Sequence, residues 1–158
     1  MIKVAILTVS DSCAAGKRQD LSGQTIEQML AGEIYQVCEK KITPDDPAAI
    51  TTELKRFSDE LGAEVVLTTG GTGLGPRDVT PEATAQVCDR LVPGISEIIR
   101  AKGLEKTKKA VLSRGLAGIR DKTLIINLPG SPKGAKESLE IILDILPHAV
   151  DMLRGGGH

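Results

Sequence analysis

The stretch that decides the fold is residues 64–82, which read EVVLTTGGTGLGPRDVTPE. It begins with an apolar run, Glu64 to Thr69, of the kind that forms a buried strand of a parallel sheet. A glycine-rich segment, Gly70 to Asp78, follows directly. Thr80 and Pro81 then predict a helix start, with a capping hydroxyl before a proline at the first helical position. A strand, a glycine loop and a helix in this order are typical of the α/β class.

Outward from this stretch, strands and helices alternate along the chain. Further strands are predicted at Lys3–Val9, Ile34–Thr43 and Thr123–Asn127. Helices are predicted over Gln24–Gly32, Asp46–Leu61, Thr80 to about Arg90, Pro93–Ile99, Ala135–Leu146 and Pro147–Leu153, and Ala110–Ile119 fits neither type. We therefore expect an α/β sandwich with a mostly parallel sheet, in one domain over residues 1–153, followed by a flexible glycine-rich tail at 154–158.

Composition excludes several classes of protein. The chain has 158 residues, with 20 Lys plus Arg against 21 Asp plus Glu, so it lacks the basic excess of a general nucleic-acid binder. Phe57 and Tyr35 are the only aromatic residues, which argues against base stacking on aromatic platforms. No run approaches the ~18 apolar residues of a membrane helix. We expect a protein without nucleic-acid or membrane partners.

The cysteines and histidines give no pattern of their own. Cys13, Cys38 and Cys88 form no CxxC pair, and two histidines offer no zinc-like cluster. Reduced thiols and the absence of a signal-peptide pattern in the first residues lead us to expect a cytoplasmic location.

Three segments leave the carboxyl ends of predicted strands, where open parallel sheets bind ligands. They are Ser10–Gly23, Gly70–Asp78 and Asn127–Gly134. In the second, glycines allow the backbone to approach a ligand closely, but neither the dinucleotide fingerprint nor a Walker loop is present. A ligand loop is favoured there over a purely structural turn.

The third loop enters a helix, whose free N–H groups favour an anion. Ser131 is suited to capping that helix or to donating to a phosphate, and Lys133 adds a positive charge. An ordinary strand–turn–helix explains this composition equally well.

Asp45 and Asp78 are the acidic candidates. A carboxylate beside a phosphate loop can hold Mg²⁺. For Asp45, pattern alone favours a structural role, as a carboxylate at a helix start, over a role as a metal ligand. Asp78 sits at the exit of the glycine loop, so for this residue the structural and the metal-binding explanations are more evenly balanced.

In combination, several segments resemble the molybdenum-cofactor biosynthesis family of molybdopterin adenylyltransferases, and the chain is also similar to the G domain of gephyrin. The matching segments are Thr8–Asp11, Asp20–Gly23, Pro44–Asp45, Thr68–Gly73 continuing through Arg77–Thr84, Ser113–Gly115 and Asn127–Lys133. The resemblance covers nearly the whole chain, from about Ile2 to Leu153.

The resemblance implies a three-layer α/β/α sandwich, usually trimeric. It also implies transfer of AMP from Mg-ATP to the terminal phosphate of molybdopterin, with release of pyrophosphate. Asp45 and Asp78 match the family's two essential, metal-holding aspartates. The positions implied to surround the pterin phosphate and the nucleotide are Ser10, Asp11, Thr69, Gly70, Gly71, Thr72, Gly73, Ser113, Asn127, Pro129, Gly130, Ser131 and Lys133.

Other functions stay open at this point. One is a binding-only role, in which the chain holds or scaffolds molybdopterin, and another is a different nucleotide-acting enzyme on the same fold, such as a pyrophosphatase. A molybdate and a tungstate pathway fit the sequence equally. The expected partners are small molecules, further copies of the chain and, transiently, other enzymes of the same biosynthesis.

Overall fold

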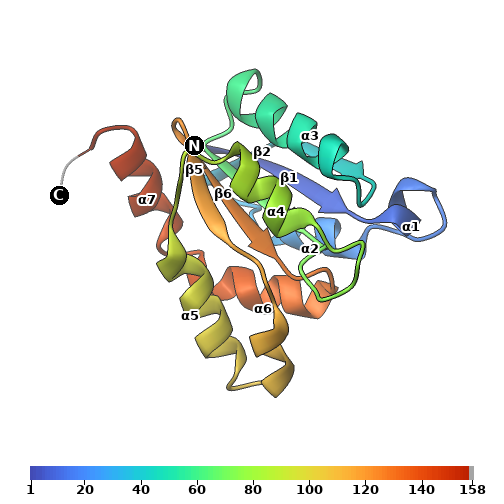
Figure 1. Cartoon of the computed structure of the whole chain (residues 1–158). Helices are drawn as coiled ribbons and strands as arrows, with labels where there is room; N and C mark the ends of the chain where they lie inside the picture. The colour runs from blue at the N-terminus through green and yellow to red at the C-terminus, as the bar shows by residue number, and fades with distance from the viewer. Residues whose placement is uncertain (157–158) are drawn as a thin grey trace.

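The computed structural model describes residues 1–156 and contains one sheet between two layers of helices (Figure 1). The sheet has six strands in the order β2-β1-β3-β6-β5-β4. They are β1 (Ile2–Val9), β2 (Tyr35–Thr43), β3 (Val65–Thr69), β4 (Arg90–Leu91), β5 (Ala117–Arg120) and β6 (Thr123–Leu128). Strands β2, β1, β3 and β6 are parallel, and β5 runs antiparallel to both β6 and β4. The expected sandwich with a mostly parallel sheet is confirmed.

Alternating side chains of β1 show how the sheet fills both of its faces. Val4 and Ile6 pack in one core cluster, whereas Ala5 and Leu7 pack in the other. Helices α3 (Pro47–Asp59) and α4 (Thr80–Val87) cover the second cluster. The first is covered by α2 (Leu21–Met29), α5 (Pro93–Gly103), α6 (Pro132–Ile142) and α7 (Leu146–Leu153). Buried residues on successive positions explain why the strand sequences are continuously apolar.

Helix starts follow local capping signals. The carboxylate of Asp46 accepts the N–H of Ala49 at 2.8 Å, and Pro47 is the first residue of α3. Ile50, Leu54 and Phe57 are fully buried along one face of this helix, as their spacing predicts. The 13-residue helix ends at Asp59, slightly before the predicted Leu61.

Other boundaries differ from the predictions. The first loop contains the short helix α1 (Asp11–Ala14), and α2 begins at Leu21 because Asp20 caps it. The predicted helix to Arg90 ends at Val87, and the next residues form the short strand β4. The segment without an assigned element contains a 3₁₀ helix, η1 (Lys108–Leu112), and strand β5.

Thr80 does not cap α4. The N-cap residue is Val79, and the Thr80 hydroxyl is buried without a hydrogen-bond partner among residues 1–156. Helix α6 begins at Pro132 because Ser131 caps it, three residues before the predicted start. In the tail predicted to be flexible, Gly156 donates to the Asp151 carbonyl at 2.8 Å, and residues 157–158 lie outside the described part.

Candidate active site at the carboxyl edge of the sheet

The parallel strands β1, β3 and β6 end side by side at Val9, Thr69 and Leu128. Strand β2 follows β1 in the sequence and lies on one side of it, whereas the next strand, β3, lies on the other side of β1. The strand order therefore reverses between β1 and β3. Such a switch point is where open parallel sheets bind ligands. The loops leaving these strands are joined, because the Gly70 N–H donates to the Leu128 carbonyl at 3.2 Å.

A cavity of about 320 Å³ lies at this switch point, and we call it the carboxyl-edge cavity. Its walls come from the ends of β1 and β3 and from the segments that follow all four parallel strands. Of the residues predicted for the site, it is lined by Ser10, Asp45, Thr69, Gly70, Gly71, Asp78, Gly130 and Ser131. The structure thus brings most of the predicted residues together, although they are far apart in the sequence.

Gly70 and Gly71 form a turn that other residues cannot make easily. Their φ angles are +101° and +69°, in the left-handed region. A Cβ on Gly70 would stand 2.2 Å from the carbonyl oxygen of Val9, and a Cβ on Gly71 would stand 2.2 Å from the Thr80 hydroxyl. These glycines permit a close backbone approach to other parts of the protein, whereas the approach to a ligand stays a prediction.

Asp45 and Asp78 reach the cavity from different elements. Asp45 follows β2, and its Oδ2 accepts the N–H of Asp11 at 2.9 Å. Asp78 ends the glycine-rich loop, and its Oδ2 accepts the N–H of Gly75 at 2.9 Å. Both side chains line the carboxyl-edge cavity, so the two aspartates lie on the same face of the sheet edge.

The pKa of Asp45 reflects its burial and its charged neighbours. Burial is the largest cause that raises the pKa of Asp45 above its usual range, and the negative charges of Asp11 and Asp78 raise it further. The hydrogen bond from the Asp11 N–H opposes this shift. A carboxylate with raised pKa beside a second carboxylate gains most from a nearby cation, which is the environment expected at a functional site.

Asp11 contacts both Arg77 and Asp45 at the rim of the loops. Its carboxylate forms a two-pronged ion pair with Arg77, at 2.9 and 3.0 Å, and also accepts the Asp45 N–H at 2.9 Å. The hydrogen bond from Arg77 is the main reason that the pKa of Asp11 is lowered. The side-chain carboxylates of Asp11 and Asp45 therefore each accept the backbone N–H of the other residue.

Asn127 and Thr69 use their polar groups within the protein. The buried amide of Asn127 donates to the hydroxyls of Thr68 and Thr84, at 3.0 and 2.9 Å, and accepts the Leu116 N–H at 3.2 Å. The Thr69 hydroxyl donates to the Pro129 carbonyl at 2.6 Å. These bonds tie β3 and β6 together beneath the cavity floor.

Three further predicted residues lie around the carboxyl-edge cavity. Thr72 is buried in the glycine-rich loop, and its carbonyl accepts the Arg114 N–H at 2.9 Å. Gly73 lies beside Asp78, and a Cβ on Gly73 would stand 2.9 Å from Asp78 Oδ2. Lys133 is exposed in the first turn of α6 and lies outside the lining of the cavity.

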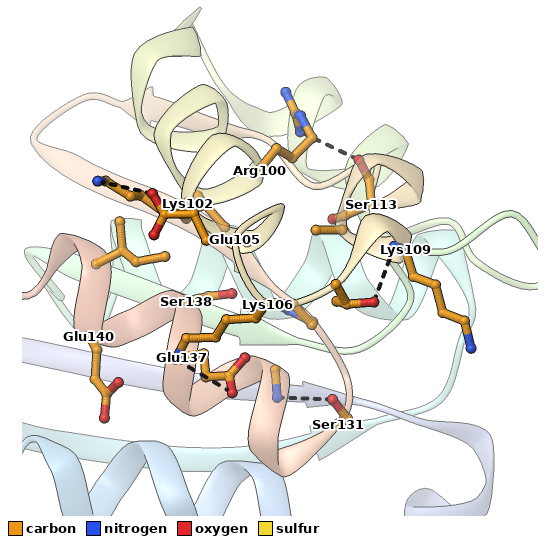
Figure 2. Close-up of a pocket in the computed structure, with 17 residues that line it drawn as sticks. Arg100, Lys102, Glu105, Lys106, Lys109, Ser113, Ser131, Glu137, Ser138 and Glu140 are labelled. Carbon is orange, nitrogen blue, oxygen red and sulfur yellow. Dashed lines mark hydrogen bonds and ion pairs between the residues drawn. The ribbon is translucent and has the colours of Figure 1, made fainter.

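Ser113 belongs to a second cavity of about 450 Å³ between α5, η1 and α6, which we call the helix cavity (Figure 2). Pro129 and Ser131 line it from the loop after β6. Lys106 and Lys109 also line it. Lys106 forms an ion pair with Glu137 of α6 at 3.6 Å, a contact that no local sequence pattern predicts.

Asp20 was not among the site residues predicted from the sequence. This residue is 8% exposed, its Oδ2 accepts from the Thr8 hydroxyl at 2.8 Å, and it lines the carboxyl-edge cavity. Asp20–Gly23 was expected in the loop before a helix and among the segments that resemble the family, and the capping of α2 by Asp20 was not predicted.

Asp45 and Asp78 lie beside a left-handed glycine turn at the switch point of a parallel sheet, which is where proteins of the α/β class bind ligands. Residues 5–148 match the family model described as "Probable molybdopterin binding domain". The chain belongs to this molybdopterin-binding family.

Relatives and solved structures agree with this assignment. Molybdopterin adenylyltransferase of Helicobacter pylori strain J99 is 41% identical over 156 residues, covering 98% of this chain and 89% of that protein. The Escherichia coli K12 protein of the same name is 36% identical over 168 residues, covering 98% and 86%. The crystal structure of the molybdopterin biosynthesis enzyme MoaB from Thermus thermophilus has 52% identity and a TM-score of 0.93, covering 98% of both chains. This structural match confirms the fold class.

Within residues 1–156, no helix combines the length and the apolar character that crossing a membrane requires.

Proposed function

We propose that this chain is a molybdopterin adenylyltransferase, which transfers AMP from ATP to the terminal phosphate of molybdopterin. The observation that carries this proposal is that Ser131 lines both cavities. A transferase needs two substrates to meet at one wall, whereas a hydrolase needs one substrate and water. The names of the relatives supply the identity of the substrates.

In this proposal the nucleotide occupies the carboxyl-edge cavity and the pterin occupies the helix cavity. The glycine turn at Gly70 and Gly71 brings the backbone close to the nucleotide phosphates, and Gly130 and Ser131 contact them from the start of α6. Lys106 and Lys109 supply positive charge to the phosphate-bearing pterin, with Ser113 at the inner end of its cavity.

The reaction exchanges one phosphorus–oxygen bond for another. An oxygen of the molybdopterin phosphate attacks the α-phosphorus of ATP, and the bond from that phosphorus to the pyrophosphate oxygen breaks. The attacking phosphate is already an anion, so the chain need not provide a strong general base. Its residues orient the two phosphates in line at the wall formed by Ser131.

Asp45 and Asp78 would hold Mg²⁺. The donor set fits a hard cation, because both residues supply carboxylate oxygens to one cavity and the charge of Asp78 raises the pKa of Asp45. Among residues 1–156 the Thr80 hydroxyl has no hydrogen-bond partner, and a Cβ on Gly71 would stand 2.2 Å from it and 3.3 Å from Asp45 Oδ1. Such an ion neutralises charge on the phosphates when it is bound. Within residues 1–156, no group of three or more acidic, histidine or cysteine side chains would hold a metal without the substrate's help.

The setting of the chain is also part of the proposal. Residues 1–153 act as one molybdopterin-binding domain, as a homotrimer in the cytoplasm, with transient contact to other enzymes of the same biosynthesis. Cys13, Cys38 and Cys88 are free thiols, as a reducing compartment requires. Exposed Leu91, Val111 and Leu112 offer apolar surface for assembly. A monomer by light scattering at micromolar concentration would contradict the trimer.

Asp78→Asn tests the catalytic part. The substitution keeps the size of the side chain and removes its charge, so AMP transfer should fall by roughly 100-fold or more while the fold is retained. Asp45→Asn should act in the same direction. Asp46→Asn is the matched control, because this neighbouring carboxylate caps α3 and asparagine caps equally well. Near-normal transfer by both Asp78→Asn and Asp45→Asn would refute the metal role and favour a binding-only protein.

A further inference from the structure

Arg114 holds the glycine-rich loop from a segment far away in the sequence. Its backbone N–H donates to the Thr72 carbonyl at 2.9 Å. Its side chain donates through Nε to the Gly73 carbonyl at 2.8 Å and through Nη2 to the Asp78 carbonyl at 2.6 Å. Arg114 lies outside the linings of both cavities, so it contacts the loop from behind the site.

The exposed part of this loop has few other contacts. Residues 74–77 are exposed, and Leu74 is 66% exposed although it is apolar. Among residues 1–156, the polar contacts of this part are the ion pair of Arg77 with Asp11 and the local bonds from the Asp78 N–H to the Gly75 carbonyl at 3.0 Å and from the Gly75 N–H to Asp78 Oδ2.

A segment without buried side chains opens at low free-energy cost. The guanidinium of Arg114 binds the carbonyls of Gly73 and Asp78, which flank this exposed part, and so holds its two ends together.

The ion pair with Glu82 fixes the guanidinium itself. Glu82 lies in the first turn of α4, and its two carboxylate oxygens accept from Arg114 Nη1 at 2.5 and 3.1 Å. The planar guanidinium presents its donors in a rigid fork, so one side chain can bind two carbonyls and a carboxylate together. Lysine keeps the charge but cannot reproduce this fork.

We propose that Arg114 is a positioning residue for Asp78. By holding the Gly73 and Asp78 carbonyls together, it keeps the Asp78 carboxylate on the cavity side, opposite Asp45. The effect on the loop stands on the hydrogen bonds alone, whereas the consequence for catalysis rests on the function proposed above. Since Arg114 contacts only backbone in this loop, its role is to orient Asp78 and it does not contact the substrate.

Amide hydrogen exchange of the ligand-free protein tests the effect on the loop. In Arg114→Lys, exchange at residues 73–79 should accelerate by about tenfold or more, because charge-assisted hydrogen bonds to both ends of the loop are lost. Arg120→Lys is the matched control, since Arg120 also binds a carbonyl, that of Val87, and a carboxylate, that of Asp59, elsewhere on the sheet. Glu82→Gln, a milder change that keeps the carbonyl contacts, should accelerate exchange in the same segment by a smaller factor.

Isothermal titration with ATP tests the consequence for Asp78. Mg²⁺ should strengthen ATP binding to the unaltered protein, and Arg114→Lys should lose most of this gain, while its ATP affinity in EDTA changes by less than about threefold. A merely structural role for Arg114 would lower the melting temperature and weaken binding equally in both conditions, which would overturn the proposal.

The two readouts separate the two hypotheses. If the unaltered protein binds no ATP, the proposed function fails, and the exchange experiment still decides the role of Arg114 in the loop. Unchanged exchange at residues 73–79 in both Arg114→Lys and Glu82→Gln would overturn the proposal, as would equal acceleration in Arg120→Lys.

Discussion

The glycine-rich loop 70–78 and the loop 129–131 leave adjacent parallel strands at the same edge of the sheet, yet they are held in different ways. The second is fixed locally, since Ser131 accepts the Gly134 N–H at 3.0 Å and Pro132 begins the helix. The first is fixed by distant groups, the Val9 carbonyl against Gly70 and the guanidinium of Arg114. The second loop thus depends mainly on its own residues, and the first mainly on the fold around it.

The largest expected effect is that of Gly70→Ala in the distantly held loop. The added Cβ meets the Val9 carbonyl at 2.2 Å at a φ of +101°, so the free energy of unfolding should fall by about 3 kcal/mol or more. Urea denaturation measures this change. Gly16→Ala is the control, because Gly16 has a φ of +73° with nothing within 4 Å of a Cβ and should cost only about 1 kcal/mol. Equal losses would show that the approach to β1 is unimportant.

Asn127→Ala should come next, since it removes the side chain that joins the strands beneath both loops. It leaves the Thr68 and Thr84 hydroxyls and the Leu116 N–H without their partner, at a cost of about 2 kcal/mol in unfolding free energy. ATP affinity, measured under conditions where the variant is folded, should change by less than about threefold. Normal stability combined with weak ATP binding would instead give Asn127 the ligand contact that the family resemblance implies.

A smaller effect is expected from Ser131→Ala in the locally held loop. The loss of the N-cap should lower the free energy of unfolding by about 1 kcal/mol, and Ser131→Asn should restore it. Thermal denaturation of the two variants provides the comparison. Failure of asparagine to restore stability would mean that Ser131 stabilises this loop by something other than capping.

Lys133→Ala should have the smallest effect. The side chain is exposed on α6 outside the linings of both cavities, so ATP affinity should fall by less than about threefold. A tenfold loss would show that Lys133 reaches a bound phosphate and that the local loop also supplies charge.

The same contrast explains how much of the fold could be predicted from the sequence. Strands β1, β3 and β6 are largely apolar runs, and Asp46-Pro47 marks the start of α3, because burial and capping leave local signals. Strands β4 and β5 have two and four residues and are stabilised by antiparallel pairing with partners distant in sequence. Neither is long enough to show an alternating pattern.

The residues of the candidate site show the same difference between local sequence signals and contacts that only the fold creates. Gly70, Gly71, Asp78 and Ser131 were identified because glycine, a carboxylate and a capping hydroxyl have recognisable uses at strand ends. The cavity-lining positions of Lys106 and Lys109 depend on how α5 and η1 pack near α6, which no local pattern reports. Likewise, the segment Ser113–Gly115 was identified through its resemblance to the family, and only the fold shows that Arg114 binds loop carbonyls.

The central claim is that two cavities sharing Ser131 bring two substrates together. The most direct test incubates the protein with Mg²⁺, molybdopterin and ATP radiolabelled at the α-phosphate, and follows the label by chromatography. We predict that label appears on molybdopterin, with one pyrophosphate released for each AMP attached, and that ATP is consumed only when molybdopterin is present. Release of free AMP without molybdopterin would identify a pyrophosphatase, and molybdopterin binding without any transfer would identify a binding-only protein; either result would contradict the account.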